Sequence, residues 1–288
     1  MTGWRWDETD DFQFIIDMCE SWNSGRLYEI FWQYSRLSPT EMKRQGAIAW
    51  IFSEDGMKRG FALARRVYGI MTIEELWCPI QGWYGPEGVL SNHDIKRISE
   101  FKKVLDHIER PLRIRASIDN CFANAFAMRL GLKWKNGMIL AVRSLTKQLK
   151  VKIPNGFNIR PYQKGDEQNI QRLHELYYNT HHGTEFYREW VNKPECETLI
   201  AETPNGFAGH IITEMRHNEF GDFDIAVASE HLKKGIGSAL LLSGLNSLYQ
   251  RNVKKAIVDY MTMNEATNGF YLKHKFHLQR VYNYFLME

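Results

Sequence analysis

The chain has 288 residues, of which 44% are hydrophobic and 25% are charged, and its formal net charge is +3. This composition excludes a disordered chain and suits one large domain or two of about 140 residues. The weak charge without a long basic run argues against nucleic acid as a partner, and no apolar run is long enough to span a membrane. The N-terminus lacks a signal-peptide pattern, so we expect a soluble, cytoplasmic protein.

The four cysteines indicate free thiols and not a metal site. Cys19, Cys78, Cys121 and Cys196 are scattered along the chain, without the short spacings of zinc ligands. His174-Glu175 lacks the second histidine that a zinc-binding helix needs. The sequence therefore predicts no bound metal.

The first half predicts helices, a hairpin, a strand, a glycine-rich loop, a helix, a strand, a short helix and a last strand. Apolar residues at helical spacing indicate the helices, and apolar runs between turn residues indicate the strands. The expected segments, in chain order, are residues 12–22, 27–34, 47–52, 60–67, 70–77, 82–88 (the loop), 98–108, 112–116, 120–131 and 140–142.

A polar, basic stretch that ends in Pro154-Asn-Gly156 predicts a joint between two halves. We place the first domain at residues 1–146, the linker at 147–156 and the second domain at 157–288. The second half repeats the order of elements of the first. Its expected segments are residues 157–162, 166–177, 184–191, 198–201, 207–215, 223–228, 235–249, 255–259, 264–273 and 278–286.

Matching anchors support an internal repeat at the scale of a domain. Residues 120–126 (NCFANAF) resemble residues 264–270 (NEATNGF), and the two hairpin turns also correspond. Two unrelated domains of ordinary α/β type are the alternative.

Residues 223–238 carry the strongest functional signal. An apolar strand is followed by a polar turn, then by Lys233 and Lys234, and Gly235 and Gly237 open a helix. The start of a helix offers unpaired N–H groups and a partial positive charge, and glycines let a ligand approach them. The stretch therefore predicts a seat for a phosphate-bearing ligand, although glycine pairs also serve tight packing alone.

The second half resembles the GNAT acyltransferase superfamily over about residues 157–288. Its pyrophosphate motif matches residues 227–237 (VASEHLKKGIG), with Leu232 where the family has Gln or Arg and Ser229 where Pro is common. A second family motif matches Asn264, Phe270 and Tyr271, with Lys275 in place of a glycine. The resemblance implies an α/β (α+β) fold of two tandem GNAT-like domains, each a mixed, mostly antiparallel sheet flanked by helices.

The resemblance also implies that acetyl-coenzyme A is the co-substrate and that an amine, on a small molecule or a peptide, receives the acetyl group. The residues that would bind the coenzyme are Val227, Ala228, Ser229, Lys233, Lys234, Gly235, Ile236, Gly237, Ser238, Asn264, Phe270 and Tyr271. The first half resembles the same fold in degenerate form, because Ala127 stands where the tyrosine belongs and the loop after Pro79 lacks the basic glycine motif. The resemblance therefore implies a tandem GNAT protein that is similar to mycothiol synthase in layout only.

Tyr271 is the expected general acid at the coenzyme sulfur, and a backbone N–H near Val227 or Ala228 would polarise the thioester. Asp222 is the first choice for the base, and Glu219 and Asp224 are neighbouring alternatives. The loop at His181 and His182, with aromatic residues nearby, is a candidate for acceptor binding.

Two other functions stay open at this point. Both halves could bind acyl-coenzyme A without turnover, because the strand lacks the family's usual glutamate. A dinucleotide site is the other rival, since Asp259 follows Gly235 and Gly237 at a strand end, but Leu240 stands where a third glycine or alanine belongs. We expect a monomer or a homodimer.

Overall fold

The structure is a computed structural model that describes residues 4–23, 38–67, 69–78, 92–118, 120–178, 182–217 and 220–287. The expected helix at 27–34 and the loop at 82–88 lie outside these residues, as do Glu219 and His181. Contacts between residues divide the chain into two compact units, one of 1–139, 260–265 and 279–288, the other of 140–259 and 266–278. This grouping differs from the predicted domain boundaries at three places, because residues 140–146 belong to the second unit and residues 260–265 and 279–288 belong to the first.

The first unit contains a mixed sheet whose strands run in the order β1-β2-β3-β4-β5-β12. Neighbouring strands are antiparallel except β4 and β5, which are parallel. The elements are β1 (Trp4–Thr9), α1 (Phe12–Asn23), α2 (Pro39–Arg44), β2 (Ile48–Glu54), β3 (Met57–Val67), β4 (Ile70–Trp77), α3 (Asn92–Leu105), β5 (Leu112–Ser117), α4 (Cys121–Arg129) and β6 (Lys133–Ser144).

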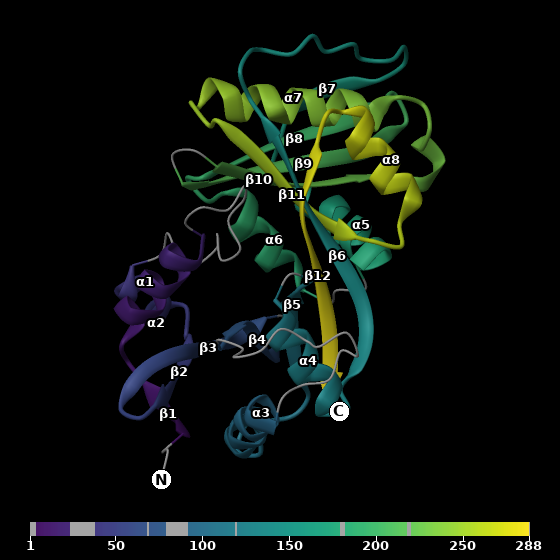
Figure 1. Cartoon of the computed structure of the whole chain (residues 1–288). Coiled ribbons are helices and arrows are strands. Elements are labelled where there is room, and N and C mark those ends of the chain that lie inside the picture. The colour runs from purple at the N-terminus through teal and green to yellow at the C-terminus, as the bar shows by residue number, and fades with distance from the viewer. Residues whose placement is uncertain are drawn as a thin grey trace. The chain divides into compact units, whose positions relative to one another are not determined.

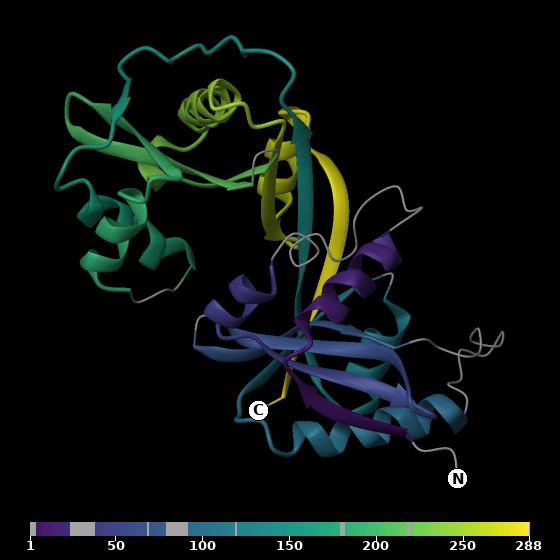
Figure 2. The ribbon, with the colours of Figure 1, turned by 90° about the vertical axis from the view of Figure 1, so that its left-hand side faces the viewer.

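Helices cover both faces of this sheet, and each face has its own core (Figure 2). Helices α3 and α4 contribute Phe101 and Phe126, which pack with strand residues such as Phe52. On the other face, α1 contributes Phe12 and Ile15. Alternate residues of one strand point to opposite faces, so β2 and β3 supply apolar side chains to both cores.

The second unit repeats this pattern. Its sheet has the order β11-β10-β9-β8-β7, antiparallel except for the parallel pair β10 and β11. The elements are β7 (Asn158–Pro161), α5 (Glu167–Tyr178), α6 (Thr184–Val191), β8 (Cys196–Thr203), β9 (Gly206–His217), β10 (Phe220–Val227), the 3-10 turn η1 (Ser229–His231), α7 (Ile236–Gln250), β11 (Lys255–Met261) and α8 (Glu265–Lys273). The last strand of the chain, β12 (His277–Met287), belongs to the sheet of the first unit.

Helix α7 packs on one face of this second sheet, and α5 and α6 pack on the other (Figure 1). Gly244 of α7 lies so close to β9 that an added Cβ would come within 2.5 Å of Ile211. From the opposite face, Ile170 of α5 packs against Ile200 and Ile212. The mixed, mostly antiparallel architecture expected from the sequence is therefore confirmed in both units.

The parallel strands of each unit separate after a short stretch of pairing. Strand β10 pairs with β11 only over Phe220–Asp222, and β4 pairs with β5 only over Met71–Ile73. Beyond these residues each of the two strands keeps its antiparallel partner on the other side. The second half of β4 and the second half of β10 are therefore each paired along one edge only. The other edge faces the gap that opens where the two parallel strands separate.

No strand is predicted before residue 12, whereas Trp4–Thr9 forms β1 and pairs antiparallel with β2. Only Trp6 of this strand is buried among the side chains that are described, so its six residues carry a weak apolar signal. Within the described part of the chain, no helix is both long and apolar enough to cross a membrane.

Candidate functional site

The second half of β10 has an open backbone edge. The N–H of Ala228 donates to the carbonyl of Ala208 at 2.9 Å, so even-numbered residues of the strand direct their backbone groups toward β9. The backbone groups of a strand alternate in direction, which turns those of Phe223, Ile225 and Val227 toward the gap before β11. An extended ligand can pair with such an edge as an added strand would.

A tyrosine of α5 occupies one group of this edge. The Tyr177 hydroxyl donates to the Val227 carbonyl at 2.7 Å. The N–H of Val227 faces the same gap, whereas the N–H of Ala228 is committed to β9. Of the two residues expected to polarise a carbonyl, Val227 is therefore the one with its N–H on the open edge.

The start of α7 forms a cradle without side chains. Gly235 precedes the helix with a left-handed φ of 87°, which favours glycine, and no side chain caps the helix start. An added Cβ on Gly237 would lie 3.6 Å from Val227 and 3.8 Å from Phe270, which is ordinary contact distance. Room for one methyl group thus exists between the helix start, the end of β10 and α8.

The polar groups of this helix start are consistent with an anionic ligand. Lys233 and Lys234 are exposed immediately before Gly235. In the first turn, the Ser238 hydroxyl lies 2.9 Å from Nε2 of His274, which directly follows α8. Burial and the nearby positive charges of Arg143 and Lys273 lower the pKa of His274. A neutral His274 that donates to Ser238 leaves the serine hydroxyl hydrogen available to a ligand.

Tyr271 is buried, with only 5% of its surface exposed. Its ring packs against Phe223, the first residue of the open edge, at a centroid distance of 6.1 Å, and against Phe270 and Phe276. The structure therefore brings Phe270 beside Gly237, and Tyr271 beside Phe223 at the start of the open edge. Asn264 lies exposed in the turn before α8, and its N–H donates to the carbonyl of Met261.

The two aspartates of β10 have different partners. One carboxylate oxygen of Asp222 accepts from the N–H of Phe223, and the other lies 3.2 Å from Arg216. Burial raises the pKa of Asp222, against the opposing effect of Arg216. Asp222 also lies where β10 and β11 are still paired, five residues before Val227.

Asp224 lies between two histidines that the sequence alone does not connect with it. Its Oδ1 is 2.9 Å from Nε2 of His174 on α5 and 3.0 Å from Nε2 of His210 on β9. Burial opposes ionisation of Asp224, but the bonds from both histidines outweigh it and hold its pKa far below the usual range. Burial lowers the pKa of His210, although Asp224 opposes this.

These three side chains are of the types that bind zinc, and their ligand atoms lie within 4.8 Å of one another. The contacts of 2.9 and 3.0 Å are hydrogen-bond distances. They are shorter than the roughly 3.3 Å that separates neighbouring ligand atoms around a tetrahedral zinc ion. The absence of a metal stays a prediction.

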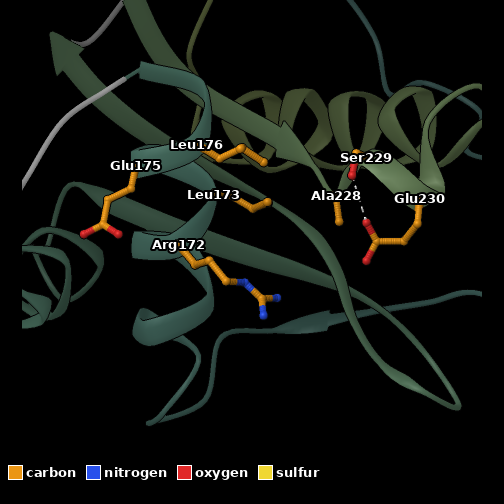
Figure 3. Close-up of a pocket in the computed structure, with 7 residues that line it drawn as sticks. All are labelled: Arg172, Leu173, Glu175, Leu176, Ala228, Ser229 and Glu230. Atoms are coloured by element: carbon orange, nitrogen blue, oxygen red, sulfur yellow. Dashed lines mark hydrogen bonds between the residues drawn. The ribbon is translucent and has the colours of Figure 1, made fainter.

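A cavity of about 520 Å³ lies between α5 and the turn that follows β10. Figure 3 shows Arg172 and Glu230 directed toward its open space from opposite walls, with Leu173 and Leu176 on the same wall as Arg172, while Glu175 points away. Ala228 and Ser229 complete the lining, so the cavity borders the end of the open edge.

Aromatic side chains of α5 and α6 gather around His174 and His182. His182 stacks on Phe186 at a centroid distance of 4.2 Å, and His174 contacts Tyr178, Tyr187 and Trp190. The structure thus places the predicted acceptor-binding aromatic residues around His174. In the sequence, His174 stands out only as half of a zinc motif, and His210 gives no signal because it is a lone histidine in an apolar strand.

The comparisons with known proteins agree with this geometry. Residues 167–276, which include the open edge, the glycine helix start and Tyr271, match the model of the acetyltransferase (GNAT) family. Residues 167–276 form a GNAT acetyltransferase domain. The family and the acyltransferase class expected from the sequence are confirmed.

Solved structures show that the GNAT fold extends over the whole chain. A GCN5-related N-acetyltransferase from Sphaerobacter thermophilus has a TM-score of 0.70 and 15% identity, with 100% of this chain and 95% of that chain covered. A tandem GNAT protein from the clavulanic acid biosynthesis pathway has a TM-score of 0.67 and 12% identity, with 99% and 98% covered.

An acetyltransferase of the GNAT family from Colwellia psychrerythraea has a TM-score of 0.63 and 11% identity, with 99% of this chain and 100% of that chain covered. These identities are too low to carry a substrate over to this chain, so the likeness is one of fold. The search of curated proteins found no relative by sequence.

Proposed function

We propose that the second unit transfers an acetyl group from acetyl-coenzyme A to an amine by direct attack within a ternary complex. The observation that carries this proposal is the open edge of β10 beside the glycine start of α7. An edge that pairs with an extended arm, next to a cradle for phosphates, suits a ligand that joins a pantetheine chain to a pyrophosphate.

The residues of the site suit the coenzyme in their arrangement. The pyrophosphate would lie on the N–H groups of Gly235, Ile236, Gly237 and Ser238, with Lys233 and Lys234 supplying positive charge. The pantetheine arm would pair with the edge that ends at Val227, before Ala228 and Ser229. Phe270 would supply an apolar contact across the cradle, and Asn264 would bond the arm or the adjacent backbone.

The proposed chemistry uses groups at the end of the edge. The Val227 N–H would donate to the thioester oxygen as negative charge develops there. Tyr271 would give a proton to the departing thiolate. Asp222 stays a candidate for the base, but its bond to Arg216 and its distance along the strand from Val227 argue against it.

The cavity lined by Arg172 and Glu230 is our proposed entry for the acceptor amine. It borders Ala228 and Ser229, so an acceptor held there would face the thioester at the end of the edge. A small molecule and a peptide terminus both remain candidate acceptors. The cytoplasmic location and the oligomeric state also stay predictions.

The first experiment tests the coenzyme seat. Acetyl-coenzyme A should raise the Tm of the wild-type protein by several degrees, because a ligand that binds only the native state stabilises it. Gly237→Ala should fold normally and respond less, since the methyl group fits the protein but fills the cradle. Gly237→Glu should not respond, because a negative side chain would occupy the seat.

Gly269→Glu is the matched control, since an added Cβ on this exposed glycine of α8 would meet nothing within 4 Å. This variant should respond to acetyl-coenzyme A as the wild type does. A Gly237→Glu protein whose Tm rises as much as that of the control would show that the proposed seat is wrong.

The second experiment tests Tyr271 as the acid. Tyr271→Phe keeps the buried ring among its aromatic neighbours but removes the hydroxyl, so binding of acetyl-coenzyme A should persist. Release of free thiol in the presence of an amine panel should fall by about 100-fold or more, the usual range for a lost general acid. Unchanged thiol release would remove the proposed role.

A further inference from the structure

Three polar side chains from three elements meet beneath the aromatic residues of α5 and α6. His174 of α5 and His210 of β9 both bond the same oxygen of Asp224 of β10. His210 is fully buried, whereas the side chain of His174 is 9% exposed and that of Asp224 is 18% exposed. The cluster therefore meets solvent through His174 and Asp224 and is closed at His210.

Packing alone does not call for this cluster. Its neighbours on the same side of the sheet are apolar, with Leu173 of α5 packed against Ala226 and Ala228 of β10. Burial of a carboxylate and two imidazoles costs free energy that apolar side chains of similar volume would avoid. Titratable groups with strongly perturbed environments of this kind are typical of functional sites.

The bonds fix which ring nitrogens carry hydrogen. The carboxylate of Asp224 only accepts, so Nε2 of both histidines must donate to it. The neutral form of each imidazole then has a lone pair on Nδ1. Nδ1 of His210 is buried without a hydrogen-bond partner in the part of the chain that the structure describes. Of the two histidines, only His174 has a partly exposed side chain, at 9%, so we take its Nδ1 as the basic nitrogen that an incoming molecule would meet.

Helix α5 connects this cluster to the end of the open edge. Tyr177 lies three residues after His174, which places both on one face of the helix. Tyr177 bonds the carbonyl of Val227, so this face of α5 lies against the edge where the thioester would be held. His174 is thus about one helical turn away from the residue that touches Val227.

We propose that His174 is the catalytic base of the acyl transfer, with Asp224 and His210 as positioning residues. Asp224 orients the imidazole and stabilises its protonated form, as the aspartate of a serine–histidine–aspartate triad does. His210 holds Asp224 from the closed side. This inference rests on the proposed transfer of an acetyl group to an amine.

The protons of the reaction balance with these roles. An ammonium acceptor first gives one proton to Nδ1 of His174 and becomes a neutral amine. The amine nitrogen forms a bond to the thioester carbon, and the carbon–sulfur bond breaks. The second proton lost by nitrogen is matched by the one that the thiolate gains, and His174 releases its own proton to solvent.

Two probes of different basicity separate a base from a merely structural histidine. Ethylamine is protonated in neutral water and needs a base, whereas hydroxylamine is already neutral. Both are compared with acetyl-coenzyme A in assays of thiol release. His174→Gln should lower the rate with ethylamine by at least about 100-fold and leave the rate with hydroxylamine within a few-fold of wild type. An equal loss with both probes, or no loss with either, would overturn the proposal.

His277→Gln serves as the control, because His277 is exposed at the start of β12. It should behave as wild type with both probes. The Tm response to acetyl-coenzyme A separates the two proposals. If the wild type binds no acetyl-coenzyme A, the proposed function fails. If binding is normal but His174→Gln leaves the ratio of the rates with ethylamine and hydroxylamine unaltered, only the role of His174 as the base is refuted.

A measurement on the unmodified protein covers the case in which the variant does not fold. Nitrogen-15 NMR of the histidine side chains should show His174 with hydrogen on Nε2 and a lone pair on Nδ1. Asp224→Asn should weaken this preference. A hydrogen on Nδ1 in the wild type would overturn the proposal, and so would a rise in Tm on adding zinc chloride that His174→Gln abolishes.

Discussion

Gly209 shows how a single residue controls the position of the reacting edge. It lies opposite Val227 on β9, and an added Cβ would come within 2.6 Å of the Ala226 carbonyl and 3.1 Å of the Val227 Cα. Both are backbone atoms, which cannot rotate away as a side chain can. Gly209 therefore lets β9 approach β10 where the Val227 N–H must be held.

We predict that Gly209→Ala lowers both stability and thiol release. Overpacking of this kind costs about 1–3 kcal/mol, and the displaced edge would misplace the Val227 N–H. Gly269→Ala is the opposite case, because its site in α8 is open and alanine favours a helix by about 1 kcal/mol. Tm values and thiol release of both variants check this, and a Gly209→Ala protein as stable and active as wild type would contradict it.

For single residues, the sequence predicts which of them lie together in the candidate site. It does not predict which of their backbone groups can still bond a ligand. The sequence motif makes both Val227 and Ala228 candidates to polarise the thioester. Only the pairing of β10 with β9 shows that the N–H of Ala228 already donates to the carbonyl of Ala208. His210 is separated from Asp224 by fourteen residues and from His174 by thirty-six. Their contact depends on strand register and helix packing, which have no local signal.

Among the elements, α5 decides where His174 and Tyr177 lie. Its first residue, Glu167, is 2% exposed and bonds Tyr162, the N–H of Gly165 and Arg188 of α6. Burial would raise the pKa of Glu167, but these bonds outweigh it and lower the pKa to about 2, against an ordinary value of 4.5. The N-terminus of α5 is thus fixed by an ionised carboxylate.

The sign of the pH effect follows from this lowered pKa. The stabilisation is present above about pH 4.5 and is lost as the pH falls through about 2. We therefore predict that Glu167→Gln lowers the Tm at pH 7 and that its difference from wild type shrinks between these two values. Thermal unfolding across this range measures it, with the exposed Glu189→Gln as control. A difference that stays constant with pH would refute the role of the charge.

The elements of the second unit follow their sequence patterns closely, because the helices are amphipathic and the strands are bounded by turn residues. The predicted helix from Gly235 to Tyr249, for example, forms as α7 (Ile236–Gln250). The point at which β10 leaves β11 is not visible in the sequence. Residues on both sides of Asp222 are equally suited to a strand, so the end of pairing depends on how the neighbouring strands twist.

For the whole molecule, the two units differ at the gap in the parallel ladder. In the first unit, the Asn120 side chain donates to the carbonyl of Leu76 on β4 at 2.6 Å. Arg115 of β5 also donates to the backbone carbonyl of Glu74 on β4 at 3.4 Å. Side chains of the protein therefore occupy the edge that, in the second unit, a ligand would pair with.

We predict that the chain binds one equivalent of acetyl-coenzyme A. Isothermal titration calorimetry of the wild type should give a stoichiometry of one, and Gly237→Glu should abolish the binding heat. The first unit would keep its edge closed in both proteins, because its own side chains already bond the strand. Two equivalents, or heat that persists in Gly237→Glu, would show that the first unit also binds the coenzyme.

The internal repeat shows how far sequence reasoning reaches at this scale. The matched anchors at Asn120 and Asn264 predict two related domains, and both units have the same order of antiparallel and parallel pairs. The assignment of the last strand is the exception. A pattern of apolar residues predicts a strand at 278–286, but it carries no information on which partner that strand will choose.

Strand β12 has a consequence for how the protein is made. Its residues Tyr282–Met287 pair with β5, so they complete the sheet of the first unit although they follow the second unit in the chain. A ribosome synthesises the N-terminal residues first. The sheet that is begun earliest therefore waits for nearly the whole chain to be translated, with the edge of β5 unprotected until then. A nascent chain stalled before residue 279 would hold a first unit without this strand.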